Sequence, residues 1–242
     1  MHKSRTPADN GHFSAEGMEP DLRDLVTPIS SEEEAWLEAQ VELVRSLTAD
    51  EEPPDAPVAP AGAPIVFLDL DDVVCICDPF GGLDALDCVT AKRVDVQLVY
   101  RHLFHTTAVA TLREMHAQMG GQLRYVISST WREFFSRAQL RYVLRQAGLD
   151  FVADCMEDRA RWSTPRFLQP DRYREVSTWL AKHHAGEPYV VIDDEWSGPS
   201  LGGSPAYPLR VILCKESVGL EAKHLDNLLR ALLTPPGPYE RW

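Results

Sequence analysis

The sequence predicts an α/β protein with a doubly wound, mainly parallel sheet, a small flap or cap insertion and an N-terminal helical extension. From Ile65 onward, short apolar runs alternate with segments of helical periodicity, which is typical of βα units. The apolar runs are continuous, as in strands that are buried on both faces of a sheet. Three of them end in acidic or hydroxyl residues, at the strand ends where such sheets bind ligands.

An acidic extension precedes this pattern. Residues 1–62 hold 14 Asp/Glu against 4 Lys/Arg, whereas residues 63–242 hold 23 against 20 and are nearly neutral. Residues 1–28 are polar and without a clear period, so we expect disorder. Residues 51–64 contain five Pro and four Ala, which indicates an extended linker. We therefore expect a domain boundary after residue 62.

One amphipathic helix is expected in the extension, over residues 31–48. Ser31 and Glu34 have the spacing of a capping box. The apolar residues that follow at helical spacing are Leu37, Val41, Val44 and Leu47. This apolar face either packs on the main domain or binds a protein partner or a second copy of the chain.

The elements of the main domain follow from periodicity and from Gly and Pro signals. We expect strands over 65–68, 124–128, 151–153, 189–192 and 209–213, and helices over 95–119, 133–147, 172–184 and 220–233. Glycines end the first two helices, and Pro235-Pro236 ends the last. Residues 75–96 are expected to form the flap, with a mobile turn at 78–82.

Composition excludes several classes of protein. A nearly neutral main domain is not a strongly basic nucleic-acid-binding domain. No apolar run reaches the roughly 18 residues of a membrane span, and no P-loop motif is present. The N-terminus lacks the apolar stretch of a secretory signal, and the five cysteines are irregularly spaced. We therefore expect a cytoplasmic protein that does not associate with membranes.

Acidic and hydroxyl residues follow three of the expected strands. These residues are Asp69, Asp71, Ser128, Ser129, Asp193 and Asp194. If the three strands are parallel neighbours, the carboxylates meet at one sheet edge and repel one another unless a cation binds among them. Mg²⁺ prefers such hard oxygen ligands, so the expected cofactor is Mg²⁺.

These motifs resemble the haloacid dehalogenase (HAD) superfamily of phosphatases and phosphotransferases. The family shows an apolar strand with D-x-D, here at 67–74, an apolar strand ending in Ser or Thr, and an apolar strand ending in an acidic pair. The chain is more closely similar to a bacterial HAD branch linked to RNA repair, akin to the phosphatase half of phage polynucleotide kinases. The motifs of that branch are S-S-T-W-R at 128–132, T-P at 164–165, an Arg-to-Trp-Leu segment at 172–180 and G-L at 219–220.

The resemblance implies roles for the two aspartates of D-x-D. Asp69 would attack phosphorus and form an aspartyl-phosphate, and Asp71 would protonate the leaving oxygen and later deprotonate water. Asp69, Asp71, Asp193 and Asp194 would hold Mg²⁺, Asp71 through its backbone carbonyl. The family position after the second aspartate is usually Gly but is Asp72 here.

The remaining implied roles concern the phosphoryl group. Ser129 would donate a hydrogen bond to it, with Ser128 as the alternative. A cation must balance its charge, and Arg-to-Trp spacing selects Arg172, with Arg174 and Arg166 as alternatives. The family more often has Lys there. Ser128 and Arg132 are further candidates for substrate contacts.

Two other groups of residues have competing interpretations. Cys75, Cys77, Cys88, His102 and His105 invite a zinc site, but C-x-C is tighter than common zinc spacing, so we expect buried or loop cysteines. Residues 124–174 hold ten Arg and no Lys. Either Arg137, Arg141 and Arg145 form ordinary charge on a helix surface, or the arginines form a track for polynucleotide phosphates.

The expected function is that of an Mg²⁺-dependent phosphatase whose substrate is an RNA or DNA end or a nucleotide. The alternatives are a small-metabolite phosphatase and a catalytically silent HAD scaffold that recruits a partner through its N-terminal helix.

Overall fold

A computed structural model describes residues 60 and 62–237, together with six isolated positions between 30 and 42. Five of those six, namely Ser31, Ala35, Glu38, Ala39 and Glu42, are helical. The apolar face expected for that helix, the segment 1–28 and most of the expected linker lie outside the described residues. No helix in the described part of the chain combines the length and apolarity that crossing a bilayer requires.

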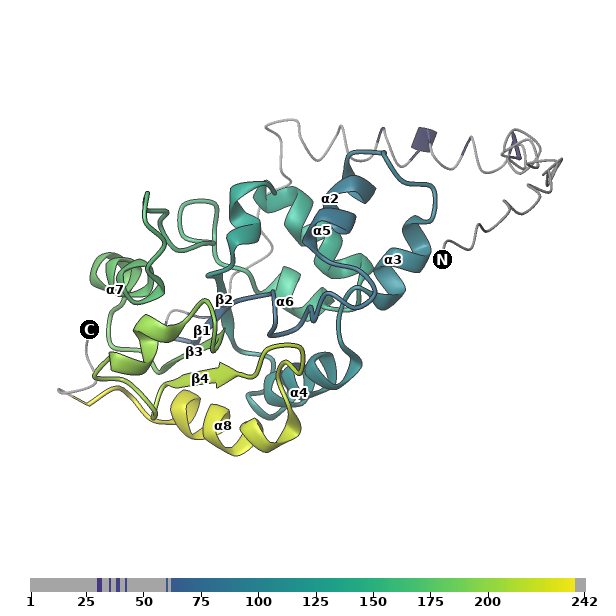
Figure 1. The fold of residues 1–242 in the computed structure, drawn as a ribbon. Coiled ribbons are helices and arrows are strands. Elements are labelled where there is room, and N and C mark those ends of the chain that lie inside the picture. The colour runs from purple at the N-terminus through teal and green to yellow at the C-terminus, as the bar shows by residue number, and fades with distance from the viewer. Residues whose placement is uncertain are drawn as a thin grey trace, which may run out of the picture. The chain divides into compact units, whose positions relative to one another are not determined.

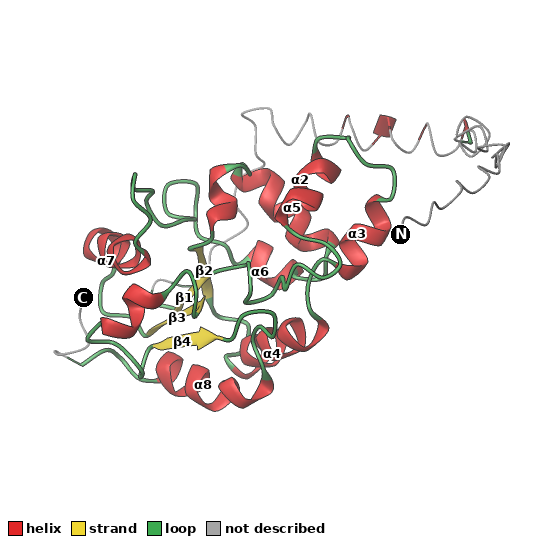
Figure 2. Ribbon diagram, viewed as in Figure 1, coloured by secondary structure: helices red, strands yellow, loops and turns green. Residues whose placement is uncertain are grey.

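The described elements alternate between strands and helices (Figures 1 and 2). In chain order they are β1 (Ile65–Leu68), α2 (Gly82–Val89), α3 (Val96–His102), α4 (Thr106–Gln118), β2 (Arg124–Ile127), the 3₁₀ turn η2 (Thr130–Glu133), α5 (Arg137–Gln146), α6 (Asp150–Asp154), α7 (Arg172–His183), β3 (Tyr189–Asp194), the 3₁₀ turn η3 (Pro199–Gly203), β4 (Val211–Cys214), the 3₁₀ turn η4 (Ala222–His224) and α8 (Leu225–Leu233).

The four strands form one parallel sheet in the order β2-β1-β3-β4. Leu68 at the end of β1 is in register with Ile127 of β2 and with Ile192 of β3. The chain therefore leaves β1 towards one neighbour and later returns to its other side, which makes the carboxyl end of β1 the switch point where such sheets bind ligands. The predicted parallel α/β sheet is confirmed.

Helices cover the two faces of the sheet (Figure 1). On one face, Trp179 of α7 packs edge-on against Phe67 of β1, with ring centroids 5.1 Å apart. Tyr189 also contacts Phe67, and Val176 belongs to the same buried cluster. On the other face, α8 contacts β3 and α4. Burial of these apolar side chains on both faces accounts for the continuous apolar runs of the strands.

Two expected elements differ from the structure. The helix expected over 95–119 is two helices, α3 and α4, because the chain is extended at His105, whose N–H donates to Val74 O at 2.7 Å. The strand expected over 151–153 is the short helix α6. The outer edge of β2 instead receives isolated parallel bridges from Met156 and Ser163.

The flap also contains an additional helix, α2. Its N-cap is Gly81, whose N–H donates to the Asp84 carboxylate at 2.9 Å, within the turn that was expected to be mobile. Gly82 faces the indole of Trp131, and a Cβ atom at this position would lie 2.7 Å from the ring. The flap is therefore packed directly against the segment that follows β2.

Two of the three arginines of α5 point inward, and both interpretations offered for them were wrong for these two. Arg137 and Arg141 are buried, and their Nε–H groups donate to the backbone oxygens of Glu157 and Ala153 at 3.0 and 3.1 Å. Arg145 pairs with Asp154 at 2.6 Å on the surface. These side chains hold α6 and the segment after it in place, and the two buried arginines do not form a phosphate track.

Candidate functional site

Three carboxylates meet at the carboxyl ends of the central strands. Asp69 directly follows β1, and Asp193 and Asp194 end the neighbouring strand β3. All three residues are buried, and one oxygen of each lies within 4.8 Å of the others. The structure therefore brings together the three residues in which the sequence analysis expected side-chain metal ligands.

Arg172 contacts this cluster from the first turn of α7. Its Nε lies 2.8 Å from an Asp193 oxygen, and its Nη2 lies 3.6 Å from an Asp69 oxygen. Its Nη1 pairs with Glu175 at 2.9 Å. The side chain of Asp171 accepts from the Arg174 N–H and begins the helix there, which sets the direction in which Arg172 extends.

The two alternative arginines lie elsewhere. Arg166 pairs with Glu133 at 3.0 Å and is largely exposed. The guanidinium of Arg174 stacks over the ring of Phe167, 4.0 Å from its centroid. Of the three candidates, Arg172 is the one that reaches the aspartates.

Burial and mutual repulsion perturb the cluster. Burial raises the pKa of Asp69 well above its usual value, the charge of Asp193 raises it further, and Arg172 acts in the opposite direction. Burial also raises the pKa of Asp193, to about 6, against the opposing effects of Arg172 and of a hydrogen bond from Ser197. One arginine therefore does not compensate three buried carboxylates.

A turn after β3 contributes contacts that the sequence analysis missed. The Ser197 hydroxyl donates to Asp193 Oδ1 at 2.9 Å and also contacts Asp194 and Asp69. One oxygen of Asp194 accepts from the backbone N–H groups of Trp196 and Ser197, at 2.6 and 2.7 Å. An aspartate that opens a turn in this way is a recognisable sequence signal.

Gly198 lies in the same turn, very close to two of the aspartates. A Cβ atom at this position would lie 2.8 Å from Asp194 O and 3.0 Å from Asp193 Oδ1. A larger residue would therefore displace the backbone that carries both carboxylates.

Asp71 lies apart from the three clustered carboxylates and has its own hydrogen-bond partners. Trp131 Nε1–H donates to Asp71 Oδ1 at 2.9 Å, and Thr130 contacts the other oxygen at 3.5 Å. Burial raises the pKa of Asp71, although the bond from Trp131 opposes this rise. A raised pKa favours the protonated carboxyl group, the form that a proton donor needs.

The two serines after β2 have different surroundings. The N–H of Ser128 donates to Leu68 O at 2.9 Å, which places Ser128 beside the end of β1. Its buried hydroxyl has no hydrogen-bond partner among the described residues. The hydroxyl oxygen of Ser129 accepts from the Trp131 N–H at 3.4 Å and caps η2. Both hydroxyls thus have a proton left to donate.

Arg132 is held by protein groups and does not point freely toward solvent. Its Nη1 donates to Ser129 O, and its Nη2 pairs with Glu175 at 2.9 Å. Burial lowers its pKa. Glu175 thus links Arg132 and Arg172, the two cations nearest the site.

A cavity of about 490 Å³ opens beside the site. Its lining includes Arg172 and Ser197, which contact the aspartates, and Trp196, which is 82% exposed to solvent. A second cavity, of about 470 Å³, shares Arg132 and Glu133 with the first. The space beside Arg172 and Ser197 is large enough for an organic group attached to a phosphate.

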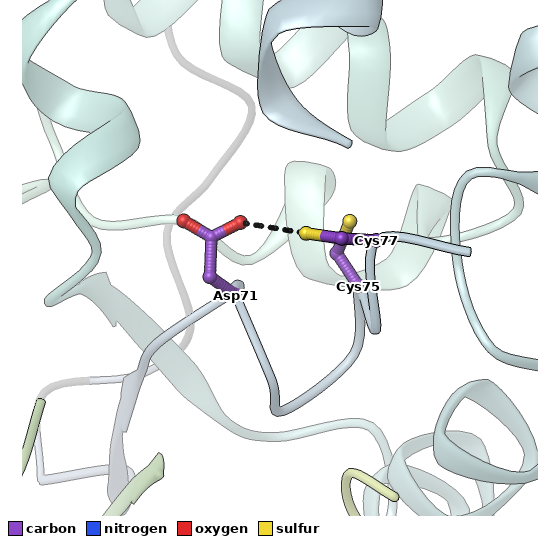
Figure 3. Close-up of side chains that lie close together, drawn as sticks. All are labelled: Asp71, Cys75 and Cys77. Atoms are coloured by element: carbon purple, nitrogen blue, oxygen red, sulfur yellow. Dashed lines mark hydrogen bonds between the residues drawn. The ribbon is translucent and has the colours of Figure 1, made fainter. Parts of the chain in front are cut away.

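The cysteines and histidines expected between 75 and 105 do not form one cluster. Cys75 and Cys77 lie beside Asp71, and these three residues offer ligand atoms within 4.8 Å of one another (Figure 3). Cys88, His102 and His105 belong to no such group among the described residues. All five cysteines are free thiols.

The comparisons with known proteins agree with this geometry. Neither the curated proteins nor the solved structures contain a match to the chain. A family model, described as the HAD domain in Swiss Army Knife RNA repair proteins, matches residues 65–225. The match starts at β1 and includes every aspartate of the site. The chain therefore belongs to the family of HAD domains found in Swiss Army Knife RNA repair proteins.

Proposed function

We propose that this HAD-type hydrolase is an Mg²⁺-dependent phosphatase that removes phosphate from a nucleic-acid end or a nucleotide through an aspartyl-phosphate. The observation that carries the proposal is the convergence of Asp69, Asp193 and Asp194 with Arg172 at the switch point of the sheet. A nucleophile, a cation site and a phosphate-binding cation are then present in one place.

The reaction divides into two displacements at phosphorus. In the first, an oxygen of Asp69 forms a bond to phosphorus while the bond to the leaving oxygen breaks, and Asp71 gives its proton to that oxygen. In the second, water attacks phosphorus, the bond to Asp69 breaks, and the carboxylate of Asp71 accepts the proton of the water. Asp71 returns to its protonated form, so protons balance over the cycle.

The phosphoryl oxygens would be held by two kinds of donor. Ser129, or Ser128 with its unpartnered hydroxyl, would donate a hydrogen bond. Arg172 already lies 3.6 Å from Asp69 and would balance the charge that moves between the attacking and leaving oxygens.

The donor set fits Mg²⁺. Asp69, Asp193 and Asp194 offer three carboxylates, all hard oxygen ligands, whose mutual repulsion a cation would relieve. The backbone carbonyl of Asp71 is the proposed fourth protein ligand. When bound, Mg²⁺ would supply positive charge that offsets the negative charge of the phosphoryl group.

Two observations support a nucleic-acid end or nucleotide as substrate. The family occurs in RNA repair proteins, and the cavity beside the carboxylates carries the exposed indole of Trp196, on which a base can stack. The five free thiols support the cytoplasm, a reducing compartment, as the place of the activity. A metabolite phosphatase, and a scaffold that binds a protein partner through residues 31–48, are the competing functions.

A substrate panel tests the proposal. We expect phosphate release from oligonucleotides with 3′- or 5′-phosphates to exceed release from sugar phosphates and from a generic aryl phosphate, and to require Mg²⁺. Faster turnover of sugar phosphates would favour the metabolite phosphatase. No phosphate release from any member, with Mg²⁺ bound, would favour the scaffold.

Thermal unfolding tests the cation site separately. Mg²⁺ should raise the melting temperature, and a phosphate mimic should raise it further only when Mg²⁺ is present, because ligands of the folded state add stability. Asp193→Ala should lose both shifts. Arg172→Lys keeps the charge but loses the planar guanidinium group. It should keep the shift caused by Mg²⁺ and reduce the shift caused by the phosphate mimic. An unchanged Mg²⁺ shift in Asp193→Ala would contradict the metal assignment.

A further inference from the structure

The loop between β1 and α2 folds back on itself beside Asp71. Asp71 and Cys75 form an isolated parallel bridge, and the N–H of Asp72 donates to Cys75 O at 2.7 Å. Asp72 and Cys77 have left-handed backbones, with φ of 52° and 56°. The result is that two thiols and one carboxylate from a seven-residue segment share one small space (Figure 3).

The separations suit a thiophilic divalent ion. Zn²⁺ binds thiolate at about 2.3 Å and carboxylate oxygen at about 2.1 Å, so neighbouring ligand atoms lie about 3.6 Å apart. Cys77 Sγ is 3.9 Å from Asp71 Oδ1, and the third ligand atom, from Cys75, lies within 4.8 Å of both. Small side-chain rotations would close this set around one ion.

The donor chemistry separates this group from the three clustered carboxylates. Asp69, Asp193 and Asp194 offer oxygen alone, which suits Mg²⁺, whereas two sulfurs select Zn²⁺ or a similar soft ion. The thiols have weak competing contacts, because Cys75 donates to Phe80 O at 3.6 Å and Cys77 to Asp71 itself.

An ion can reach this group from solvent. Cys77 is exposed, whereas Cys75 is buried behind it. Three protein ligands leave a fourth position for water. Binding as two thiolates would release the two thiol protons to solvent, while the Asp71 carboxylate would bind in its ionised form.

We propose that Asp71, Cys75 and Cys77 form a second, inhibitory metal site for Zn²⁺ or another thiophilic divalent ion. The inhibitory part rests on the proposed function, because it requires Asp71 to be the proton donor. An ion bound to the Asp71 carboxylate occupies the oxygens that would face the leaving group and blocks the first displacement.

Cobalt spectroscopy tests binding without any activity measurement. Co²⁺ added to the reduced full-length protein should produce the near-ultraviolet absorption of cobalt-bound thiolate. Cys77→Ser, a change at an exposed position, should lose most of that absorption. Cys155→Ser, which changes a thiol at the end of α6, is the matched control and should keep it. Equal absorption in Cys77→Ser and the unmodified protein would overturn the proposal.

Zinc titration tests inhibition, with each rate expressed relative to the same variant without Zn²⁺. At saturating Mg²⁺, Zn²⁺ should lower the turnover of the unmodified protein and of Cys155→Ser at least tenfold. The same inhibition of Cys77→Ser should need a Zn²⁺ concentration at least tenfold higher. Equal inhibition of all three proteins would overturn the inhibitory role. Failure of the proposed function would show as absent turnover before Zn²⁺ is added, and the cobalt result would still decide binding.

Discussion

The two ends of the sheet handle buried charge in opposite ways. At the amino end, Arg124 begins β2 and pairs with Glu157 at 2.9 Å and with Glu187 at 2.8 Å, while its Nε–H donates to Ala63 O. At the carboxyl end, Asp69 and Asp193 share Arg172, which also pairs with Glu175, and Asp194 lies beside the two aspartates. At the amino end Glu157 also contacts Arg161 at 3.6 Å, so two glutamates face two arginines, whereas acids outnumber bases at the carboxyl end.

The pKa directions show that difference. Burial raises the pKa of Glu187, but backbone N–H groups and Arg124 outweigh burial, and the pKa lies below its usual value. The pKa of Asp69 and that of Asp193 both lie above their usual values. Ionised carboxylates therefore stabilise the amino end and destabilise the carboxyl end.

The largest effect that would sharpen this comparison is expected for Asp69→Asn. Removing the proposed nucleophile should lower turnover at least about 10³-fold. The melting temperature without Mg²⁺ should stay the same or rise, because one repelling charge is gone. Steady-state kinetics and thermal unfolding measure the two effects, and turnover at the unmodified rate would exclude Asp69 as nucleophile.

At the amino end, Glu157→Gln should lower stability and leave turnover unchanged, the reverse of Asp69→Asn. Arg124 would lose a charged partner in a buried position, which should lower the free energy of unfolding by about 3 kcal/mol. Turnover per folded molecule should stay unchanged. Urea unfolding measures the loss, and Glu114→Gln, at an exposed helix position, is the control and should change it by less than about 0.5 kcal/mol.

Acidification should affect the two ends in opposite directions. Asp193 has a folded-state pKa of about 6, above the unfolded 3.8, so it binds its proton more readily when folded. Without divalent cations, the free energy of unfolding should therefore rise as pH falls from 7 through 6. Glu187 acts oppositely, because its pKa is below 4.5 when folded, and its contribution is lost below that pH.

Thermal unfolding across pH 4–8 measures both effects. We expect a stability maximum near pH 4.5 without divalent cations, and its displacement to higher pH with Mg²⁺. Stability that falls steadily from pH 7 to pH 5 in the absence of cations would contradict the uncompensated charge at the carboxyl end.

A smaller effect is expected for Trp131→Phe. The variant removes the hydrogen bond to Asp71, which should lower kcat about tenfold, or about 1.4 kcal/mol. Because that bond lowers the pKa of Asp71, the limb of the pH profile that depends on Asp71 should move to higher pH. Trp179→Phe removes an indole that donates to Arg161 O in the core, and it should leave this limb in place.

The smallest effect is expected for deletion of residues 1–62. Ala63, whose carbonyl accepts from Arg124, remains, so the ion pairs at the amino end are kept. We expect a folded protein with unchanged turnover and melting temperature. Insolubility or a lowered melting temperature would show that the extension covers part of the core.

Local sequence patterns predicted the sheet and the three strand ends that carry acidic or hydroxyl residues, because continuous apolar runs are a strong local signal. They could not distinguish a strand from a helix over 151–153, where three apolar residues suit either structure and the edge of β2 is filled from elsewhere. The break near His105 depends on a hydrogen bond to Val74, a contact that periodicity does not contain.

The direction of the side chains was the second feature that the sequence patterns could not predict. The spacing of Arg137 and Arg141 indicated a shared helix face but not that this face is turned toward backbone carbonyls. Arg172 was selected by its distance from a tryptophan in the sequence, and the structure places it at the aspartates. Ser197 was missed because a serine in a loop carries no local signal unless the turn begun by Asp194 is recognised.

Gly198 has a consequence for finding relatives of this chain. Because a Cβ there would lie 2.8 Å from Asp194 O, and Ser197 contacts all three aspartates, we expect the string that specifies this turn, from the end of β3, to be D-D-x-x-S-G and not the acidic pair alone. Acidic pairs are common in unrelated sequences, whereas the six-residue string specifies a turn that can hold both carboxylates. Searches that require it should separate chains with a complete site from distant homologues that keep the fold but have lost the turn.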